Sequence, residues 1–284
     1  MIIGKKEIIN ISSLAISQIG ASHQDVGICE DSSAVYQDSS MAIACVADGH
    51  GDSRCFRANL GSKFAVEIGI QCVKEFVANQ PNIDFNDTKE IDKTFVQLKT
   101  YILFKWLERI KNHLLAHPIE EREIGLMRAE DYEEYQREGI FKSYPIIYGS
   151  TFILACVTNG FYFALQLGDG DVAIDNKKFE MPLPEDTRCF GPVTTSLCND
   201  DAIDSFRHYY AKGNPKAIMV STDGLSNSFA EQQQFLNLLK MVEKNIVESG
   251  IDAAKPEIID FFARLTEAGS HDDISLGAIV RVGE

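Results

Sequence analysis

Four acidic side chains adjoin short apolar runs of the sequence, which suggests that buried strands deliver them to polar turns. Glycine stands beside three of them, as expected for tight turns. One Asp-Gly pair is an ordinary turn signal, but four carboxylates at strand ends favour a shared chemical role. They are Asp48 after 41–47, Asp169 after 161–167, Asp223 after 217–220, and Asp272 before 274–282.

Carboxylates that converge at strand ends repel one another, and each raises the pKa of its neighbours unless a cation neutralises them. Such a site therefore indicates a hard divalent metal with oxygen ligands. Cysteine and histidine show no ligand-like spacing, which disfavours zinc. The donor set favours magnesium or manganese in an octahedral site.

Alternating strand and helix signals position these turns along the chain. The apolar run 41–47 predicts a buried strand, and Asn159-Gly160 between two β-rich runs predicts a hairpin. Further extended runs are expected at 172–175, 217–220 and 274–282. Apolar residues at helical spacing predict amphipathic helices. The expected helices span 54–77, 89–115, 231–247 and 256–268.

Between about 116 and 143 the sequence is highly charged and has few core residues. We interpret this stretch as an exposed excursion with some helix rather than a domain boundary. A single domain is therefore expected over 1–284. The acidic part, 120–138, is either a solvated surface or a flap that contacts substrate.

Composition and charge exclude several classes of protein. With 45% hydrophobic and 24% charged residues in 284, the chain is typical of globular proteins. A net charge of -15 disfavours binding to nucleic acid or anionic membranes. No export signal and no run of about 18 apolar residues is present, and seven scattered cysteines favour free thiols. We expect a cytoplasmic monomer.

Six short motifs stand in an order that resembles the PP2C-type, metal-dependent serine/threonine protein phosphatases, in a divergent bacterial-type branch. The resemblance spans nearly the whole chain, and Asp-Gly-His-Gly after an apolar strand is its most specific part. It implies an α+β, four-layer α-β-β-α sandwich of two antiparallel sheets with helices on both outer sides. The motifs are Glu30-Asp31-Ser32, Asp48-Gly49-His50-Gly51, Tyr148-Gly149-Ser150-Thr151, Gly168-Asp169-Gly170, Ser221-Thr222-Asp223-Gly224 and 269–275.

The resemblance implies two manganese or magnesium ions. By it, Asp48 bridges both ions, the Gly49 carbonyl binds one, and Asp223 and Asp272 bind the other. Two divalent ions among three carboxylates leave a charge near +1, which attracts a phosphate dianion into an acidic protein. A water activated by the metals then attacks phosphorus, and no covalent enzyme intermediate is needed.

Further roles follow from the resemblance. Glu30 would support one ion through water, with Asp31 ordering its loop, and Asp169 would bind a third, weaker ion. His50 would protonate the departing seryl or threonyl oxygen, for which a neutral pKa is suitable. An exposed acidic turn is the alternative for Glu30, and a solvated turn for Asp169 with Asp171.

Two positions depart from the family pattern. Many members have a phosphate-binding arginine four residues before the acidic position matched by Glu30, where this chain has Val26. His23, Arg54 or Arg57 are candidate substitutes. The final acidic pair ends in Asp273, where asparagine is commoner, and the additional charge is expected to retune metal affinity.

Five conspicuous side chains have simpler interpretations. Cys29 and Cys55 flank the expected site, and we interpret both as small hydrophobic residues. Tyr101, Phe104 and Trp106 follow a helical apolar pattern and are expected in the core.

The sequence favours a metal-dependent phosphatase that hydrolyses phosphoserine or phosphothreonine esters of proteins. Three alternatives remain open. A haloacid dehalogenase-like phosphatase with an aspartyl-phosphate intermediate would use Asp169 and Asp171, but it leaves the Asp48 turn unexplained. A metal-binding pseudophosphatase would recognise a partner without turnover. A purely structural acidic domain would bind no metal tightly.

Overall fold

Two five-stranded antiparallel sheets pack face to face in the computed structural model, which describes residues 10–25, 27–79, 87–191 and 193–283. Val26 lies outside the described residues. The first sheet runs β1 (Ile11–Gln18), β10 (Ile274–Arg281), β9 (Ala217–Ser221), β6 (Asp171–Asp175) and β7 (Phe179–Glu180). The second runs β2 (Ser32–Gln37), β3 (Met41–Ala47), β4 (Phe152–Thr158), β5 (Phe161–Leu167) and β8 (Arg207–Lys212).

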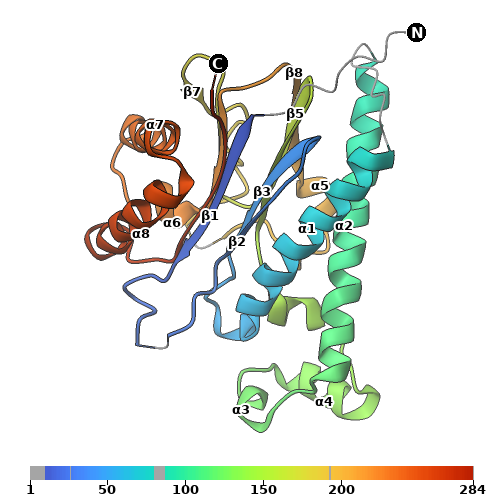
Figure 1. Cartoon of the computed structure of the whole chain (residues 1–284). Coiled ribbons are helices and arrows are strands. Elements are labelled where there is room, and N and C mark those ends of the chain that lie inside the picture. Colours follow the sequence, from blue (N-terminus) through green and yellow to red (C-terminus); the bar gives the residue numbers. More distant parts are fainter. Residues whose placement is uncertain (1–9, 26, 80–86, 192, 284) are drawn as a thin grey trace.

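Helices cover the outer face of each sheet, so the four-layer sandwich expected from the sequence is confirmed (Figure 1). Two long helices pack against the second sheet and two against the first. Short helices lie in the connections. The helical elements are η1 (Ser53–Cys55), α1 (Ala58–Asn79), α2 (Thr88–Ala116), α3 (Glu121–Ile124), α4 (Ala129–Glu138), η2 (Tyr144–Tyr148), α5 (Ala202–Ser205), α6 (Asp223–Ser226), α7 (Gln232–Ser249) and α8 (Ile251–Ala268).

Small side chains fill the space between the two sheets. Ala42 and Ala44 of β3 and Ala155 of β4 are fully buried there, together with Ile218 and Val220 of β9. Strands buried on both faces explain why β3 and β4 read as continuous apolar runs. The strand that carries Asp48 is therefore held rigidly on both sides.

The hairpin predicted at Asn159-Gly160 is confirmed, since β4 and β5 are joined by these two residues alone. Gly160 has φ of +100°, a conformation that side chains disfavour, which explains glycine in this turn. β5 then ends at Leu167, directly before Gly168 and Asp169.

The long helices agree with their predicted positions except near their starts. The stretch predicted as one helix from 54 is divided into η1 and α1, and α8 begins at Ile251, five residues before Pro256. Because proline is most common in the first helical turn, the sequence predicts that the helix starts at Pro256, and this predicted start is five residues too late. No helix within the described ranges is long and apolar enough to cross a membrane.

Two aromatic predictions for α2 are wrong. Trp106 is fully buried, but Phe104 is 59% exposed and Tyr101 is 38% exposed. The buried face of α2 follows Ile102, Trp106 and Ile110 at four-residue spacing, which turns positions 101 and 104 toward solvent. Lys105 Nζ lies 5.9 Å from the ring centroid of each exposed aromatic residue.

The charged stretch after α2 folds as the short helices α3 and α4, which extend from the sandwich beyond the end of α1 (Figure 1). Arg57 attaches this segment to the body of the protein. Its guanidinium makes a bidentate ion pair with Glu123, with N–O distances of 2.9 and 2.7 Å, and donates to the carbonyls of His117 and Pro118. The excursion is thus fixed by a buried charge pair at its base.

Candidate active site

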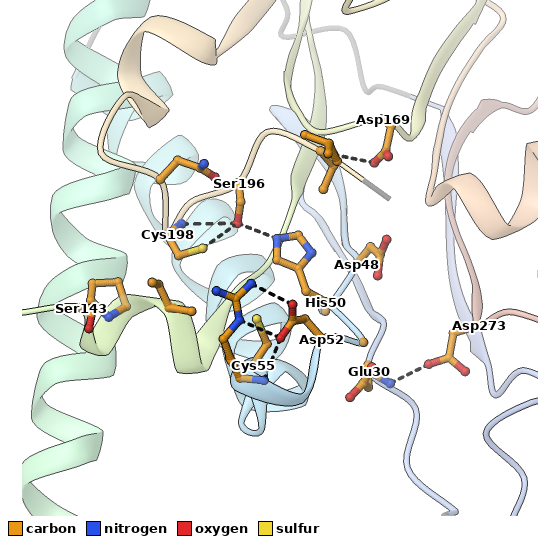
Figure 2. Close-up of a pocket in the computed structure, with 18 of the residues that line it drawn as sticks. Glu30, Asp48, His50, Asp52, Cys55, Ser143, Asp169, Ser196, Cys198 and Asp273 are labelled. Carbon is orange, nitrogen blue, oxygen red and sulfur yellow. Dashed lines mark hydrogen bonds and ion pairs between the residues drawn. The ribbon is translucent and has the colours of Figure 1, made fainter. Parts of the chain in front are cut away.

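Strand ends and loops from both sheets meet around one cleft of about 1380 Å3. Every residue expected to bind metal lies on its wall, and so does His50. Figure 2 shows Glu30, Asp48, His50 and Asp169 there. The structure therefore brings together segments that are up to 242 residues apart. The shared set is Glu30, Asp48, Gly49, His50, Asp169, Asp223 and Asp272.

The turn after β3 is fixed by its pairing with the residues before β4. The Asp48 N–H donates to Thr151 Oγ1, and the Thr151 N–H donates to the Asp48 carbonyl, both at 2.9 Å. A bridge between Gly49 and Ser150 continues the same pairing. A Cβ on Gly49 would lie 2.5 Å from the Glu30 carbonyl oxygen, so only glycine fits between these segments.

Asp48 lies among other carboxylates. Burial raises the pKa of Asp48 well above its ordinary value, and the negative charges of Asp31, Asp223, Asp272 and Asp169 raise it further. These groups therefore lie close enough to destabilise one another's charged forms.

The same effects act on two neighbours of Asp48. Burial, followed by the charges of Asp169 and Asp272, raises the pKa of Asp223 to about 7. Burial raises the pKa of Glu30 to about 7 as well. The negative charges of Asp273 and Asp272 raise it further, whereas the interaction with His23 lowers it. The cleft thus concentrates negative charge around Asp48, Asp223 and Glu30.

The donor set fits a hard divalent cation. Within the described ranges, Asp48, Asp223 and Asp272 form no ion pair with lysine or arginine. As placed in the structure, no three or more carboxylate, imidazole or thiol side chains of the described residues lie close enough together to hold a metal ion. The match to a hard cation lies in the donor type, because carboxylate oxygens are the ligands that magnesium prefers.

Two buried carboxylates hold the loop that carries Glu30. Asp31 is 5% exposed and accepts the Thr222 hydroxyl at 2.7 Å. Asp273 accepts the Gly20 N–H with one oxygen and the Glu30 N–H with the other, each at 2.6 Å. Aspartate at position 273, where asparagine is commoner, therefore supplies two carboxylate oxygens that accept backbone N–H groups.

His50 is held at the cleft by a residue that sequence reasoning missed. Its Nε2 lies 2.7 Å from Ser196 Oγ (Figure 2). Burial lowers the pKa of His50, although Asp169 and Asp52 act in the opposite direction. Ser196 had no recognisable signal, because the sequence around it contains no glycine turn or apolar run ending at that position.

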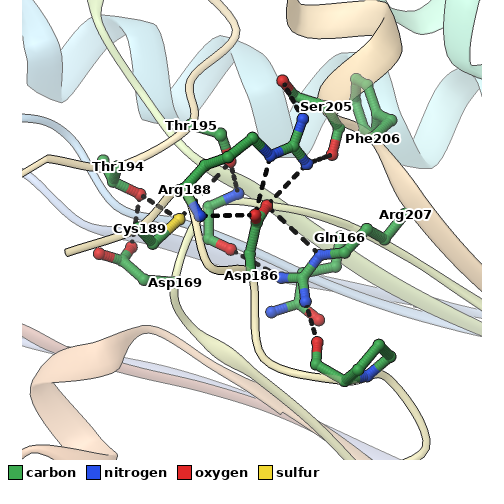
Figure 3. A network of polar contacts seen from close by, with 12 residues as sticks. Gln166, Asp169, Asp186, Arg188, Cys189, Thr194, Thr195, Ser205, Phe206 and Arg207 are labelled. Atoms are coloured by element: carbon green, nitrogen blue, oxygen red, sulfur yellow. Dashed lines mark hydrogen bonds and ion pairs between the residues drawn. The ribbon is translucent and has the colours of Figure 1, made fainter.

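Asp169 is connected to the same loop as Ser196. The Thr194 hydroxyl donates to Asp169 Oδ1 at 2.8 Å, and the Gly168 N–H donates to Thr195 Oγ1 at 2.9 Å (Figure 3). Asp171, by contrast, lies in β6 outside the cleft wall, and burial raises its pKa to about 6.

An ion cluster anchors this loop, with Arg188 on its exposed side. The Asp186 carboxylate lies between the guanidinium groups of Arg188, at 2.8 Å, and Arg207, at 3.7 Å (Figure 3). Arg207 also donates to the Gly168 carbonyl at 3.0 Å. The cluster thus links the loop of Ser196 to the turn of Asp169.

The three candidates for a phosphate-binding cation differ in position. Arg57 is wrong for this role, because it is buried against Glu123 and does not line the cleft. Arg54 lines the cleft and is paired with Asp52 at 2.8 Å. His23 also lines the cleft, with its Nδ1 3.1 Å from Asp273 Oδ1.

Two cysteines near the site are protonated thiols at neutral pH. Burial raises the pKa of Cys55 to about 12 and also raises that of Cys29. Cys55 is 5% exposed and packs as a small apolar side chain, as expected.

Comparisons with known proteins agree with this architecture. A bacterial serine phosphatase superposes with a TM-score of 0.57 at 15% identity, covering 96% of this chain and 99% of that one. The catalytic domain of the serine threonine protein phosphatase PstP, in complex with two manganese ions, has a TM-score of 0.55 at 12% identity, covering 96% and 99%. The phosphatase Stp1 from Staphylococcus aureus has a TM-score of 0.55 at 14% identity and covers both chains fully.

At these identities the superpositions show the fold. A search of curated proteins found no match. The family model described as protein phosphatase 2C matches residues 19–262, which is most of the chain. The chain therefore belongs to the protein phosphatase 2C family.

Proposed function

We propose that this protein phosphatase hydrolyses phosphoserine and phosphothreonine esters of proteins with two manganese or magnesium ions. The carboxylates of Asp48, Asp223 and Asp272 carry the proposal, because they line one cleft and, within the described residues, none of them is paired with a lysine or arginine. The solved phosphatases with the same fold support the substrate class and manganese.

In this proposal Asp48 would be shared by the two ions, and the Gly49 carbonyl would be a ligand of one of them. Asp223 and Asp272 would be ligands of the other ion, and Glu30 would contribute through water. Asp169 would hold a third, weaker ion. Two divalent ions in such a site supply a hydrolytic nucleophile from water at neutral pH and stabilise negative charge on the phosphoryl group.

The remaining steps belong to the protein's own side chains. His50 gives a proton to the seryl or threonyl oxygen as it departs, since an alkoxide is too basic to leave unaided. His23 and Arg54 line the same cleft and are the candidates for contacts with phosphate oxygens. α4 provides the far wall of the cleft, where the peptide chain beside the phosphorylated residue would lie.

Cellular context is part of the same proposal. All seven cysteines are free thiols, which supports a reducing compartment such as the cytoplasm. We propose that the protein acts there as a monomer in signalling by reversible phosphorylation.

The test measures phosphate release from a phosphothreonine peptide and from p-nitrophenyl phosphate. Activity should require manganese or magnesium and should disappear in EDTA. Asp48→Ala should lose bound manganese in calorimetry together with almost all turnover. Metal-independent activity, or a hydroxylamine-sensitive phosphoenzyme, would contradict the proposal and favour an aspartyl-phosphate mechanism.

A pseudophosphatase predicts a different result from the same experiment. It would bind manganese tightly and release no phosphate from either substrate. A structural acidic domain would show no tight manganese binding at all.

A further inference from the structure

The hydrogen bond between His50 and Ser196 occupies one of the two imidazole nitrogens. Nε2 lies 2.7 Å from Ser196 Oγ, and Ser196 is only 2% exposed. The other ring nitrogen, Nδ1, faces the side of the cleft where Asp48 lies (Figure 2). The Nδ1 edge of the imidazole ring therefore faces the cleft, and the Nε2 edge is held by Ser196.

Backbone groups fix the position of the Ser196 hydroxyl. It donates to the Ser150 carbonyl at 3.0 Å and accepts the Ser150 N–H at 3.2 Å. The Leu197 N–H also donates to the Ser150 carbonyl, at 2.9 Å, which pairs the two segments directly. Ser150 precedes β4 and forms a bridge with Gly49. The hydroxyl is therefore held by the same strands that position Asp48.

The direction of the hydrogen bond between His50 and Ser196 depends on where the hydroxyl proton lies. A serine hydroxyl has one proton, and three atoms lie within its reach: His50 Nε2 at 2.7 Å, the Ser150 carbonyl oxygen at 3.0 Å and Cys198 Sγ at 3.2 Å. Of these the carbonyl oxygen can only accept, and the proposal places the proton there. The oxygen is then an acceptor toward His50, so Nε2 carries a proton and donates it. Only Nδ1 remains available to exchange a proton with a bound substrate.

We propose that Ser196 is a positioning residue that holds the His50 ring so that Nδ1 serves the departing alkoxide. In this step the oxygen–phosphorus bond of the ester breaks, and the leaving oxygen takes the proton from Nδ1. The Nδ1 electron pair stays on the ring, which becomes neutral with its proton on Nε2. The proposal rests on the proposed phosphatase function and adds a residue and an atom to it.

The loop of Ser196 has the rigidity that such a role needs. The Gly168 N–H donates to Thr195 Oγ1 at 2.9 Å, and the Thr194 hydroxyl donates to Asp169 Oδ1 at 2.8 Å, so the two residues before Ser196 are both held. Positioning groups are effective when other contacts restrict their own freedom.

Ser196→Ala tests the proposal, with Ser205→Ala as the matched control. Ser205 is also a buried serine but lies outside the cleft wall. One neutral hydrogen bond corresponds to about a tenfold effect at most. Ser196→Ala should therefore lower kcat for a phosphothreonine peptide about tenfold, with KM unchanged. It should change kcat for p-nitrophenyl phosphate less than twofold, because nitrophenolate leaves without a proton. Ser205→Ala should preserve the ratio of the two rates.

A double-mutant cycle separates positioning from general stability. Ser196→Ala should cause no further loss in a His50→Ala background, because the ring that it positions is absent. An equal loss on both substrates, or the same loss with and without His50, would overturn the role of Ser196. A wild-type protein inactive on both substrates would overturn the proposed function itself.

Nitrogen-15 NMR of the metal-free protein gives a readout independent of turnover and of variant folding. The His50 ring of the wild-type protein should show a protonated Nε2 protected from solvent exchange. Ser196→Thr, which keeps the hydroxyl, should preserve this signal and the ratio of rates. A wild-type ring with its neutral-state proton on Nδ1 would overturn the proposal.

Discussion

The carboxylate of Asp273 accepts the backbone N–H of Glu30 at 2.6 Å, which joins the start of β10 to the loop that carries Glu30. The two residues are 243 positions apart in the chain. Asp272, the neighbour of Asp273, is exposed at the cleft. Adjacent aspartates thus have different surroundings, and this difference is testable.

Asp273→Asn should destabilise the fold while largely preserving metal binding. An amide offers one acceptor oxygen, so a buried N–H of the loop loses its partner, at a cost of about 1–3 kcal/mol in unfolding free energy. Asp272→Asn should do the reverse, with weaker manganese binding and little change in stability. Chemical denaturation and calorimetry measure the two effects. Unchanged stability with strongly reduced manganese affinity in Asp273→Asn would indicate that Asp273 itself binds the metal.

The metal-free protein should become more stable as pH falls from 7.5 to 5. The pKa values of Glu30 and Asp223 are raised from 4.5 and 3.8 to about 7, so the folded state binds protons that the unfolded state releases. Stability therefore declines as pH rises through this range. Thermal unfolding in EDTA across this range provides the measurement, and Asp223→Asn should flatten the dependence. A metal-free wild type that gains stability with rising pH would contradict the assignment.

Arg57→Ala should destabilise the protein by about 3–5 kcal/mol, because it leaves the Glu123 carboxylate without its partner. The double variant Arg57→Met with Glu123→Leu should recover much of the loss by replacing the ion pair with apolar contacts. Urea unfolding of the three variants measures this. Equal stability of Arg57→Ala and wild type would show that the pair does not anchor the α3–α4 segment.

Glu130→Lys should weaken binding of peptides that carry arginine or lysine beside the phosphothreonine. Glu130 is exposed on the cleft wall provided by α4. One exposed charge pair corresponds to about a two- to fivefold rise in KM. Glu133→Lys is the matched control, because Glu133 is exposed on the same helix outside the cleft wall.

The α4 prediction has a second readout in p-nitrophenyl phosphate, which has no peptide chain to reach α4. Its KM should be the same in both variants. If Glu133→Lys raised the peptide KM as much as Glu130→Lys, general charge would explain the effect and α4 would have no specific contact.

Local sequence signals were sufficient wherever a strand was buried on both faces. β3 and β4 appear as continuous apolar runs, and Asn159-Gly160 marks the hairpin that joins β4 to β5. The edge strands β1, β2 and β8 were missed, because half-buried strands mix polar with apolar residues. The four-layer sandwich was predicted from the order of the six motifs and not from hydrophobic periodicity, because the motifs are spread over nearly the whole chain.

The sequence by itself determined which acidic residues stand at strand ends and that their charge requires a cation. These are properties of neighbouring residues, because an apolar run and the turn after it are continuous in the chain. Only the tertiary structure decided that Ser196 contacts His50, that Asp273 fixes the loop of Glu30, and that Arg57 is buried against Glu123. Each of these pairs joins segments more than 60 residues apart, and side-chain hydrogen bonds between distant segments leave no pattern in the local sequence.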